Sequence, residues 1–341
     1  MSQGGERTKP RNRTCHCMTS VREYLIMYGG FTEWCNEEHY GLWIYNTVSG
    51  VWRRYQTPIV SANASFESSI CTDGNLVYIF GGVCCRNNYL PTNSLISFNI
   101  VNDAWKTLSP HIDDYDENTP PPMCDNLLFY HNEFLYVLGG INDDEQLDTM
   151  YKFCLRTSTW SFVEQNGTKP SFDGKILGTV FENQFYHFGG MSNVFDFSTN
   201  TWTSRATKSK TGKFPDERSE ESFTFSDNIG YLSGGENLKT RTIYSDVWKF
   251  DLATLEWLKL DCSLQTSLYS HCTSVVEDYY LYVFGGLGIE SDRLKTFERF
   301  IIRPPALYRS CLESICGSPN FESYTTSLPA EILDEINFHI K

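Results

Sequence analysis

Two short clusters of cysteine and histidine are the residues whose types and spacing come nearest to metal chemistry. They are Cys15-His16-Cys17 and Cys84-Cys85. Thiolates and imidazoles bind zinc, but neither cluster has the paired CxxC spacing of a structural zinc site. Because side chains alternate between the two faces of a strand, His16 would also point away from both neighbouring sulfurs. The sequence therefore predicts no metal site and no cofactor.

The elements that must position any site are set by a repeat, in which a run of β-branched and aromatic residues ends in paired glycines. The first glycines of its six copies are separated by 52, 58, 50, 45 and 51 residues. Such side chains favour strands, and paired glycines allow a tight exit that a Cβ atom would obstruct. A period of roughly 50 residues is typical of kelch-type propeller repeats. The copies span residues 25–30, 77–82, 135–140, 185–190, 231–235 and 281–286.

After five of the six glycine pairs, the chain continues with a second apolar strand, a polar turn and a tryptophan. With a preceding strand, such as residues 15–21, each unit forms a four-stranded blade. The predicted fold is therefore all-β, a closed six-bladed propeller over residues 1–303, followed by a short α-helical segment over residues 304–341. The sixth unit lacks the tryptophan strand. Either residues near the N-terminus supply that strand, or this blade has three strands whose edge is covered by the C-terminal segment.

The repeated signature resembles the kelch-repeat family. Many of its repeats begin their first strand with Arg-x-x-His, and Arg13 and His16 keep both residues. We expect this pair to form a hydrogen-bonded corner at the strand end, with a ligand contact as the alternative. Kelch oxidases and sialidases would need copper-binding histidines with a tyrosine, or three arginines with a tyrosine and an acidic pair. The seven histidines lie scattered along the chain, so the sequence predicts a protein that is not an enzyme.

The composition bears on partners and on cellular location. The 28 basic and 42 acidic residues give a net charge of −14, which repels phosphate backbones and predicts no nucleic-acid partner. No stretch approaches the ~20 apolar residues that span a bilayer, and the first residues lack the apolar core of a signal peptide. We expect an intracellular protein of the cytoplasm or nucleus. Its twelve cysteines should then be reduced and pack as small apolar residues.

Beyond Pro304 and Pro305, the apolar spacing changes from that of a strand to that of a helix. Leu307, Cys311 and Ile315 recur at every fourth position, which predicts a short amphipathic helix over residues 305–316. A second helix is predicted to begin at Ser327, with a proline in its first turn. A propeller needs neither helix, so they either cover the edge of the sixth blade or bind a partner.

Both helical stretches resemble motifs of ubiquitin-ligase receptors. Residues 306–315 are similar to an elongin-binding box, and Leu328-Pro329-Ala330-Glu331-Ile332 is similar to a short cullin box. This order after six kelch repeats resembles the kelch-domain-containing substrate receptors of elongin B/C, cullin-2-type ubiquitin ligases. A kelch scaffold that only binds other proteins is the alternative. The resemblance implies that Leu307, Cys311 and Ile315 bind elongin and that Leu328, Pro329 and Ile332 bind cullin.

The same resemblance places the protein substrate on the propeller face made by the loops after the glycine pairs and by the starts of the first strands. A cationic mouth there would suit the terminal carboxylate of a substrate, with Arg218 as a bidentate partner and Ser219 as a donor. Alternatively, each cation pairs with a nearby acid. Relatives that bind C-terminal glycine tails have an arginine and a tryptophan where this chain has Met191 and Glu220, so the class of degron stays open. The candidate substrate-binding residues are Phe31, Arg86, Lys175, Arg218, Ser219, Arg241 and Tyr269.

Overall fold

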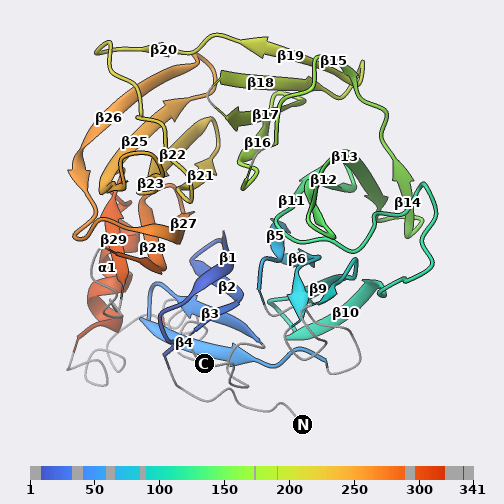
Figure 1. Cartoon of the computed structure of the whole chain (residues 1–341). Helices are drawn as coiled ribbons and strands as arrows, with labels where there is room; N and C mark the ends of the chain where they lie inside the picture. Colours follow the sequence, from blue (N-terminus) through green and yellow to red (C-terminus); the bar gives the residue numbers. More distant parts are fainter. Residues whose placement is uncertain are drawn as a thin grey trace.

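The chain forms six β-sheets arranged as blades around one axis, which confirms the predicted six-bladed propeller (Figure 1). The computed structural model describes residues 9–32, 41–58, 66–84, 90–172, 174–189, 191–288, 296–318 and 333. None of the helices in these ranges is long and apolar enough to cross a membrane.

Blade one shows the common plan. Its strands β1 (Thr14–Val21), β2 (Tyr24–Phe31), β3 (Leu42–Asn46) and β4 (Val51–Tyr55) pair antiparallel in chain order, with β1 innermost (Figure 1). The later blades follow this plan: within each blade, the strands lie further from the axis in the order in which they occur in the chain.

The other five blades are assembled from later strands of the chain. Blade two has β5 (Ser69–Asp73), β6 (Leu76–Phe80), β9 (Leu95–Asn99) and β10 (Ala104–Ser109), and blade three has β11 (Leu127–His131), β12 (Phe134–Asn142), β13 (Glu145–Cys154) and β14 (Thr159–Phe162). Blade four has β16 (Gly178–Phe181), β17 (Gln184–Gly189), β18 (Met191–Asp196) and β19 (Thr201–Arg205), and blade five has β21 (Ser222–Ser226), β22 (Ile229–Ser233), β25 (Asp246–Asp251) and β26 (Glu256–Ser263). Blade six has β27 (Tyr269–Val276), β28 (Tyr280–Leu287) and β29 (Phe297–Ile301).

Two blades carry a fifth strand that the repeat pattern did not predict. The strands β15 (Asn166–Gly167) and β20 (Lys208–Ser209) pair in parallel with the outer strands β19 and β26. Each belongs to the connection that arrives from the preceding blade. Two short hairpins, β7 (Val83–Cys84) with β8 (Leu90–Pro91) and β23 (Glu236–Asn237) with β24 (Thr242–Ile243), come after the glycine pairs of blades two and five. Strands of two residues are too short to leave a periodic signal in the sequence.

The paired glycines are required because they lie close to the neighbouring blade and to the first strand of their own blade. Gly285 has φ +78°, and a Cβ atom there would lie 2.4 Å from the carbonyl oxygen of Arg13 in blade one. Gly286 has φ +92°, and its Cβ would lie 2.8 Å from the Cβ of His271 in its own blade. The first glycine therefore makes room for the neighbouring blade, and the second makes room for the first strand of the same blade.

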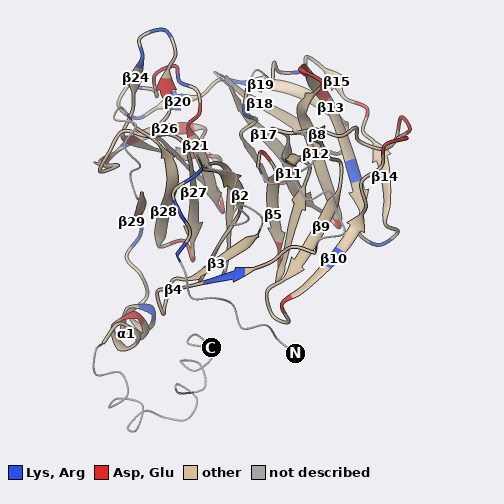
Figure 2. Ribbon diagram, turned by 60° about the horizontal axis from the view of Figure 1, so that its bottom comes forward, with Lys and Arg blue, Asp and Glu red and all other residues tan. Residues whose placement is uncertain are grey.

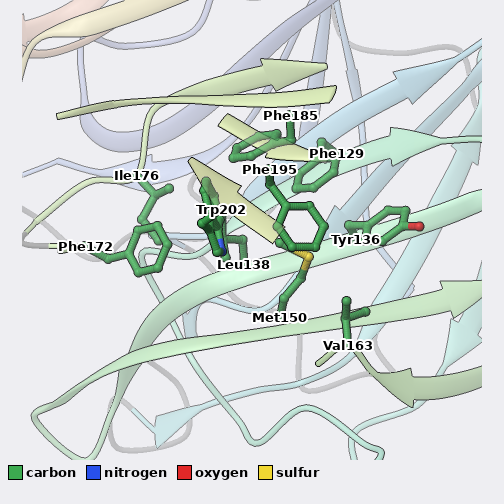
Figure 3. Packing of buried hydrophobic residues seen from close by; sticks show 10 residues of the cluster. All are labelled: Phe129, Tyr136, Leu138, Met150, Val163, Phe172, Ile176, Phe185, Phe195 and Trp202. Carbon is green, nitrogen blue, oxygen red and sulfur yellow. The ribbon is translucent and has the colours of Figure 1, made fainter. Parts of the chain in front are cut away.

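The hydrophobic core is divided among the six interfaces between neighbouring blades, each with its own cluster of buried residues. Figure 3 shows the cluster between blades three and four, where Trp202 packs against Phe185 and Phe195. The indole nitrogen of Trp202 donates a hydrogen bond to Gln165, 2.8 Å away, so its single polar group stays satisfied. Trp202 therefore packs on two rings of its own blade and is hydrogen-bonded to the connection that arrives from blade three.

In the part of the chain that the structure describes, the ring closes between blades six and one with no strand shared by the two ends. Within the described residues, blade six has three strands, and β1 belongs to blade one. Closure rests on the apolar cluster of this seam and on a few hydrogen bonds. The Gly286 amide donates to the Arg13 carbonyl at 3.0 Å, and the Cys272 thiol donates to the His16 carbonyl at 2.9 Å. Of the two alternatives for blade six, the three-stranded one is observed.

The C-terminal helix α1 (Leu307–Cys316) begins two residues later than predicted. It packs against Thr47 and Glu277, which lie in the turns β3–β4 and β27–β28. These turns are at the opposite end of the propeller from the loops after the glycine pairs, as Figure 2 shows by the separation of α1 from β24. The second predicted helix, from Ser327, lies outside the described ranges apart from residue 333.

Candidate functional site

One residue per blade lies at the start of the innermost strands and forms a ring at the mouth of the propeller. We call it the mouth ring, and it consists of Cys15, Glu67, Asp125, Lys175, Glu220 and Ser270. Main-chain hydrogen bonds link neighbours directly: the Glu67 amide donates to the Cys15 carbonyl at 2.9 Å, and the Asp125 amide donates to the Glu67 carbonyl at 3.2 Å. The Ser270 amide likewise donates to the Glu220 carbonyl at 2.8 Å, so main-chain bonds join three members of the ring on one side and two on the other.

The residues of the mouth ring occupy equivalent positions of the sequence repeat. Counted back from the first glycine of each pair, the ring residue stands 14 positions earlier in blades one to five and 15 earlier in blade six. Five of the six residues have φ between 50° and 57°, a left-handed conformation that turns the chain into the first strand. None of the five is glycine, the residue type that would have indicated a left-handed conformation from the sequence.

The charge of the mouth ring is negative. Oxygens of Glu67 and Asp125 and the sulfur of Cys124 all lie within 4.8 Å of one another. Burial and the neighbouring charge of Glu67 raise the pKa of Asp125 to about 6, and burial also raises the pKa of Glu67. These shifts show that the carboxylates are crowded and partly removed from water.

Lys175 is the one cation of the mouth ring. Its surface is exposed to solvent, but many protein atoms lie around its ammonium group. Their presence reduces the hydration of that group and by itself would lower its pKa. Cys272 and the carboxylates of Glu220 and Asp125 outweigh that effect, so the pKa of Lys175 is raised. Lys175 is therefore a firmly charged counterion to the ring carboxylates, and those carboxylates outnumber it.

The guanidinium group of Arg218 is already bound to other groups of the protein. Its side chain is 2% exposed and forms an ion pair with Asp246, with 2.8 Å between Nη1 and Oδ1. The same nitrogen donates to the Gly234 carbonyl at 2.9 Å, and the guanidinium stacks over Tyr244 at 4.0 Å. These contacts correspond to the alternative in which the cation pairs with an acid of its own blade. A substrate carboxylate would have to displace Asp246 to reach Arg218.

Arg13 forms the equivalent corner of blade one. Its Nη1 donates to the Gly29 carbonyl at 2.8 Å and its Nε to the Arg11 carbonyl at 3.0 Å. Arg218 repeats both contacts, because its Nε donates to the Asp216 carbonyl at 3.0 Å. Of the Arg13–His16 pair predicted to form this corner, Arg13 forms it, whereas the His16 ring meets Phe284 of blade six edge-on; Arg218 holds the same corner in blade five.

The other candidate residues are spread around the mouth. Phe31 is 40% exposed and meets Phe66 edge-on, with ring centroids 6.2 Å apart. Tyr269 is half-buried opposite Leu287, and the Ser219 main chain pairs with Glu236. Arg241 is exposed in the β23–β24 hairpin, and Arg86 lies outside the described residues. Of the predicted cations that the structure describes, Lys175 lies among the three carboxylates of the mouth ring, Arg218 is paired with Asp246, and Arg241 is exposed in its hairpin.

We expect Arg218→Ala to destabilise the propeller by about 3 kcal/mol, because it leaves a partly buried carboxylate without its main partner. Urea unfolding followed by tryptophan fluorescence would measure the change. Lys239→Ala is the matched control, since Lys239 and Glu217 form an ion pair in which both side chains are more than 70% exposed. Equal stability of the two variants would contradict the role of Arg218 as a corner.

The helix α1 has one face on the propeller and one face in solvent. Arg309 and Leu312 are 5% and 4% exposed. Arg309 donates to the Thr47 hydroxyl at 2.6 Å, forms an ion pair with Glu277 and a second one with Glu313. These contacts fix the helix across the turns of blades one and six.

The residues of the elongin-box resemblance lie mainly on the opposite face. Leu307 is 80% exposed, Cys311 is exposed and Ile315 is half-buried. Leu328, Pro329 and Ile332 of the cullin-box resemblance lie outside the described residues. The buried Arg309 was not among the residues predicted from the sequence, since a lone arginine within an amphipathic stripe gives no sign of its distant partners.

A six-bladed ring of this kind, with a solvent-facing mouth, defines a kelch-type protein interaction module. Residues 111–286, just over half of the chain, match the KLHDC2/KLHL20/DRC7 Kelch-repeats domain. The chain belongs to this Kelch-repeat domain family.

Comparison with individual proteins gives full-length but distant similarity. Kelch domain-containing protein 10 of Rattus norvegicus is 25% identical over 340 residues, which cover 91% of this chain and 81% of the relative. The Homo sapiens protein of the same name is also 25% identical, with 91% and 75% covered. Host cell factor 2 of Homo sapiens is 25% identical over 297 residues, covering 76% of this chain and 36% of that protein.

Proposed function

We propose that this protein is the substrate-recognition subunit of a cullin-RING ubiquitin ligase. In this proposal the exposed face of α1 binds elongin B/C, the segment with Leu328 and Pro329 binds a cullin-2-type scaffold, and the mouth of the propeller binds a protein substrate. The observation that carries the proposal is the 80% exposure of Leu307 on a helix whose other face is firmly docked.

A helix that only covered the edge of blade six would be expected to bury its large apolar side chains. Instead, α1 buries Arg309 and Leu312 and leaves Leu307 and Tyr308 in solvent, at 80% and 50% exposure. An exposed leucine on a docked helix suits insertion into an apolar groove of a partner. Cys311 lies one turn further along, and its small side chain lets a second helix approach closely. These features support the partner-binding role of the helix.

The wider class is a non-catalytic protein interaction scaffold, which needs only the propeller. Such a scaffold would use the mouth and leave the exposed face of α1 without a partner. Binding of elongin is therefore the property that separates the two functions.

We expect Leu307→Ala to weaken elongin B/C binding at least ~10-fold, because truncating a leucine that becomes desolvated removes about 2 kcal/mol. The measurement is a quantitative pull-down of elongin B/C by the full chain, with thermal melts of every variant. Melting should not change, since Leu307 makes little contact with the propeller. Ile301→Ala is the control, because Ile301 is 65% exposed and lies outside the helix.

The neighbouring positions sharpen this test. Cys311→Ser should be tolerated and Cys311→Phe should not, since the required property is small size. Leu328→Ala and Pro329→Ala should reduce cullin recruitment while elongin stays bound. Absence of elongin binding by the intact chain, or full binding by Leu307→Ala, would remove the ligase function and leave the scaffold.

A further inference from the structure

An exposed apolar patch lies beside the mouth ring on blades six, one and two. It consists of Leu287, Phe31 and Phe66, of which Leu287 is 44% and Phe31 is 40% exposed. Phe31 pairs with Thr14 at the start of β1, and the Asn12 side chain donates to the Gly286 carbonyl at 3.1 Å, next to Leu287. The rings of Phe31 and Phe66 are in contact. We call these three residues, the Phe31–Phe66 pair of blades one and two and Leu287 of blade six, the apolar rim.

The apolar rim continues directly into the carboxylates of the mouth ring. Phe66 is followed in sequence by Glu67, whose side chain lies beside that of Asp125. Glu220 adds a third carboxylate, and its Oε2 accepts a hydrogen bond from the Ser270 hydroxyl at 2.9 Å. Against these three acids the ring offers Lys175 alone. A ligand on the apolar rim therefore meets net negative charge toward the axis.

The crowding of these acids favours the entry of a cation. Like charges within a few ångströms of each other disfavour ionisation, and an opposite charge placed between them relieves that repulsion. Burial raises the pKa of both Asp125 and Glu67, and the charge of Glu67 adds to the rise at Asp125. A terminal carboxylate of a partner would instead add to the repulsion, and Arg218, the expected counterion, is already held by Asp246.

We propose that the mouth binds a protein segment in which an apolar side chain, seated on the apolar rim, is next to a lysine or arginine that enters among the carboxylates of Glu67, Asp125 and Glu220. This inference rests on the proposed function only in calling that segment a substrate. Nucleic acid does not fit, because its phosphates meet the same acids. A metal ion alone would leave the apolar rim unused.

The test is a selection from a phage-displayed library of random peptides on the immobilised full-length chain. Selected peptides should be enriched in arginine and lysine beside apolar residues. Labelled synthetic copies of them are then titrated by fluorescence anisotropy against the wild type and variants. We expect Glu67→Gln with Asp125→Asn, and separately Phe31→Ser, to weaken binding at least ~10-fold, since a charge-assisted contact and a buried aromatic ring each contribute about that much.

The matched control is the double variant Glu133→Gln with Glu182→Gln. It removes the same charge from two exposed turns, β11–β12 and β16–β17, at the end of the propeller opposite the mouth, and should leave peptide binding unchanged. Selected peptides without an excess of basic residues, an empty selection, or equal loss of binding in both double variants would overturn the proposal.

The elongin pull-down on the same variants separates this inference from the proposed function. Glu67→Gln with Asp125→Asn should retain full elongin binding, because the mouth and α1 lie at opposite ends of the propeller (Figure 2). If elongin binds but no basic peptide is selected, the receptor function stands and the cationic class of substrate is wrong. If basic peptides bind but elongin does not, the mouth is a scaffold site.

Discussion

A Gly285→Ala protein is expected to fail to close its propeller. At φ +78° an added Cβ would lie 2.4 Å from the Arg13 carbonyl oxygen and 2.6 Å from the His16 ring, both in blade one. The first of these atoms is main chain, so no rotamer change relieves the clash. The left-handed conformation costs an alanine about 1–2 kcal/mol and overpacking about 1–3 kcal/mol, which together approach ~5 kcal/mol. That is a large share of the ~5–15 kcal/mol that stabilises a typical domain.

The measurement is the yield of soluble protein together with the midpoint of urea unfolding. Gly74→Ala isolates the backbone term, because Gly74 has φ +56° and nothing within 4 Å of its added Cβ. It should lose about 1–2 kcal/mol and remain folded. If Gly285→Ala were no less stable than Gly74→Ala, the contact across the seam would not be what requires a glycine.

An Arg309→Met protein is expected to lose about 4 kcal/mol of stability, because removing one member of a buried ion pair leaves its partner charge uncompensated. Arg309 is 5% exposed, and its guanidinium contacts the Thr47 hydroxyl, Glu277 and Glu313 at once. Methionine keeps much of the apolar stem of arginine and removes the guanidinium, which lies over the Tyr280 ring, so the loss reports mainly on the contacts of the charged group.

Urea unfolding gives the size of this loss, and limited proteolysis shows whether the helix has detached. The control is Arg299→Met, which removes the pair with Glu313 from a side chain that is 42% exposed. It should change stability by less than ~1 kcal/mol. An Arg309→Met protein that is as stable and as protease-resistant as Arg299→Met would show that α1 is not anchored through this arginine.

The fold could be predicted because its signal is repeated and local. Each strand that ends in Gly-Gly can be recognised from its own adjacent residues. Six copies at a spacing of roughly 50 residues indicated six blades. The three-stranded sixth blade was one of two alternatives, since the sequence shows a missing strand but not whether a distant segment replaces it.

The site could be predicted less well, because its charges are decided by contacts between blades. Arg218 has acidic neighbours in sequence, yet its partner is Asp246, 28 positions away on β25. Glu67 and Asp125 are 58 positions apart and become neighbours only when blades two and three pack side by side. Predictions that weighed each cation in its local sequence therefore missed the carboxylates that come together at the mouth ring.

The docking of α1 on the seam has a consequence for how the propeller and its helix influence each other. The helix is held by Thr47 of the first blade and Glu277 of the last, so its docked position exists only while the ring is closed. Any partner that prefers the docked helix must, by thermodynamic linkage, stabilise the closed ring by the same free energy. Reciprocally, a propeller that opens at the seam loses affinity for that partner. Binding of a partner to the helix therefore stabilises the folded propeller, and unfolding of the propeller weakens the binding of that partner.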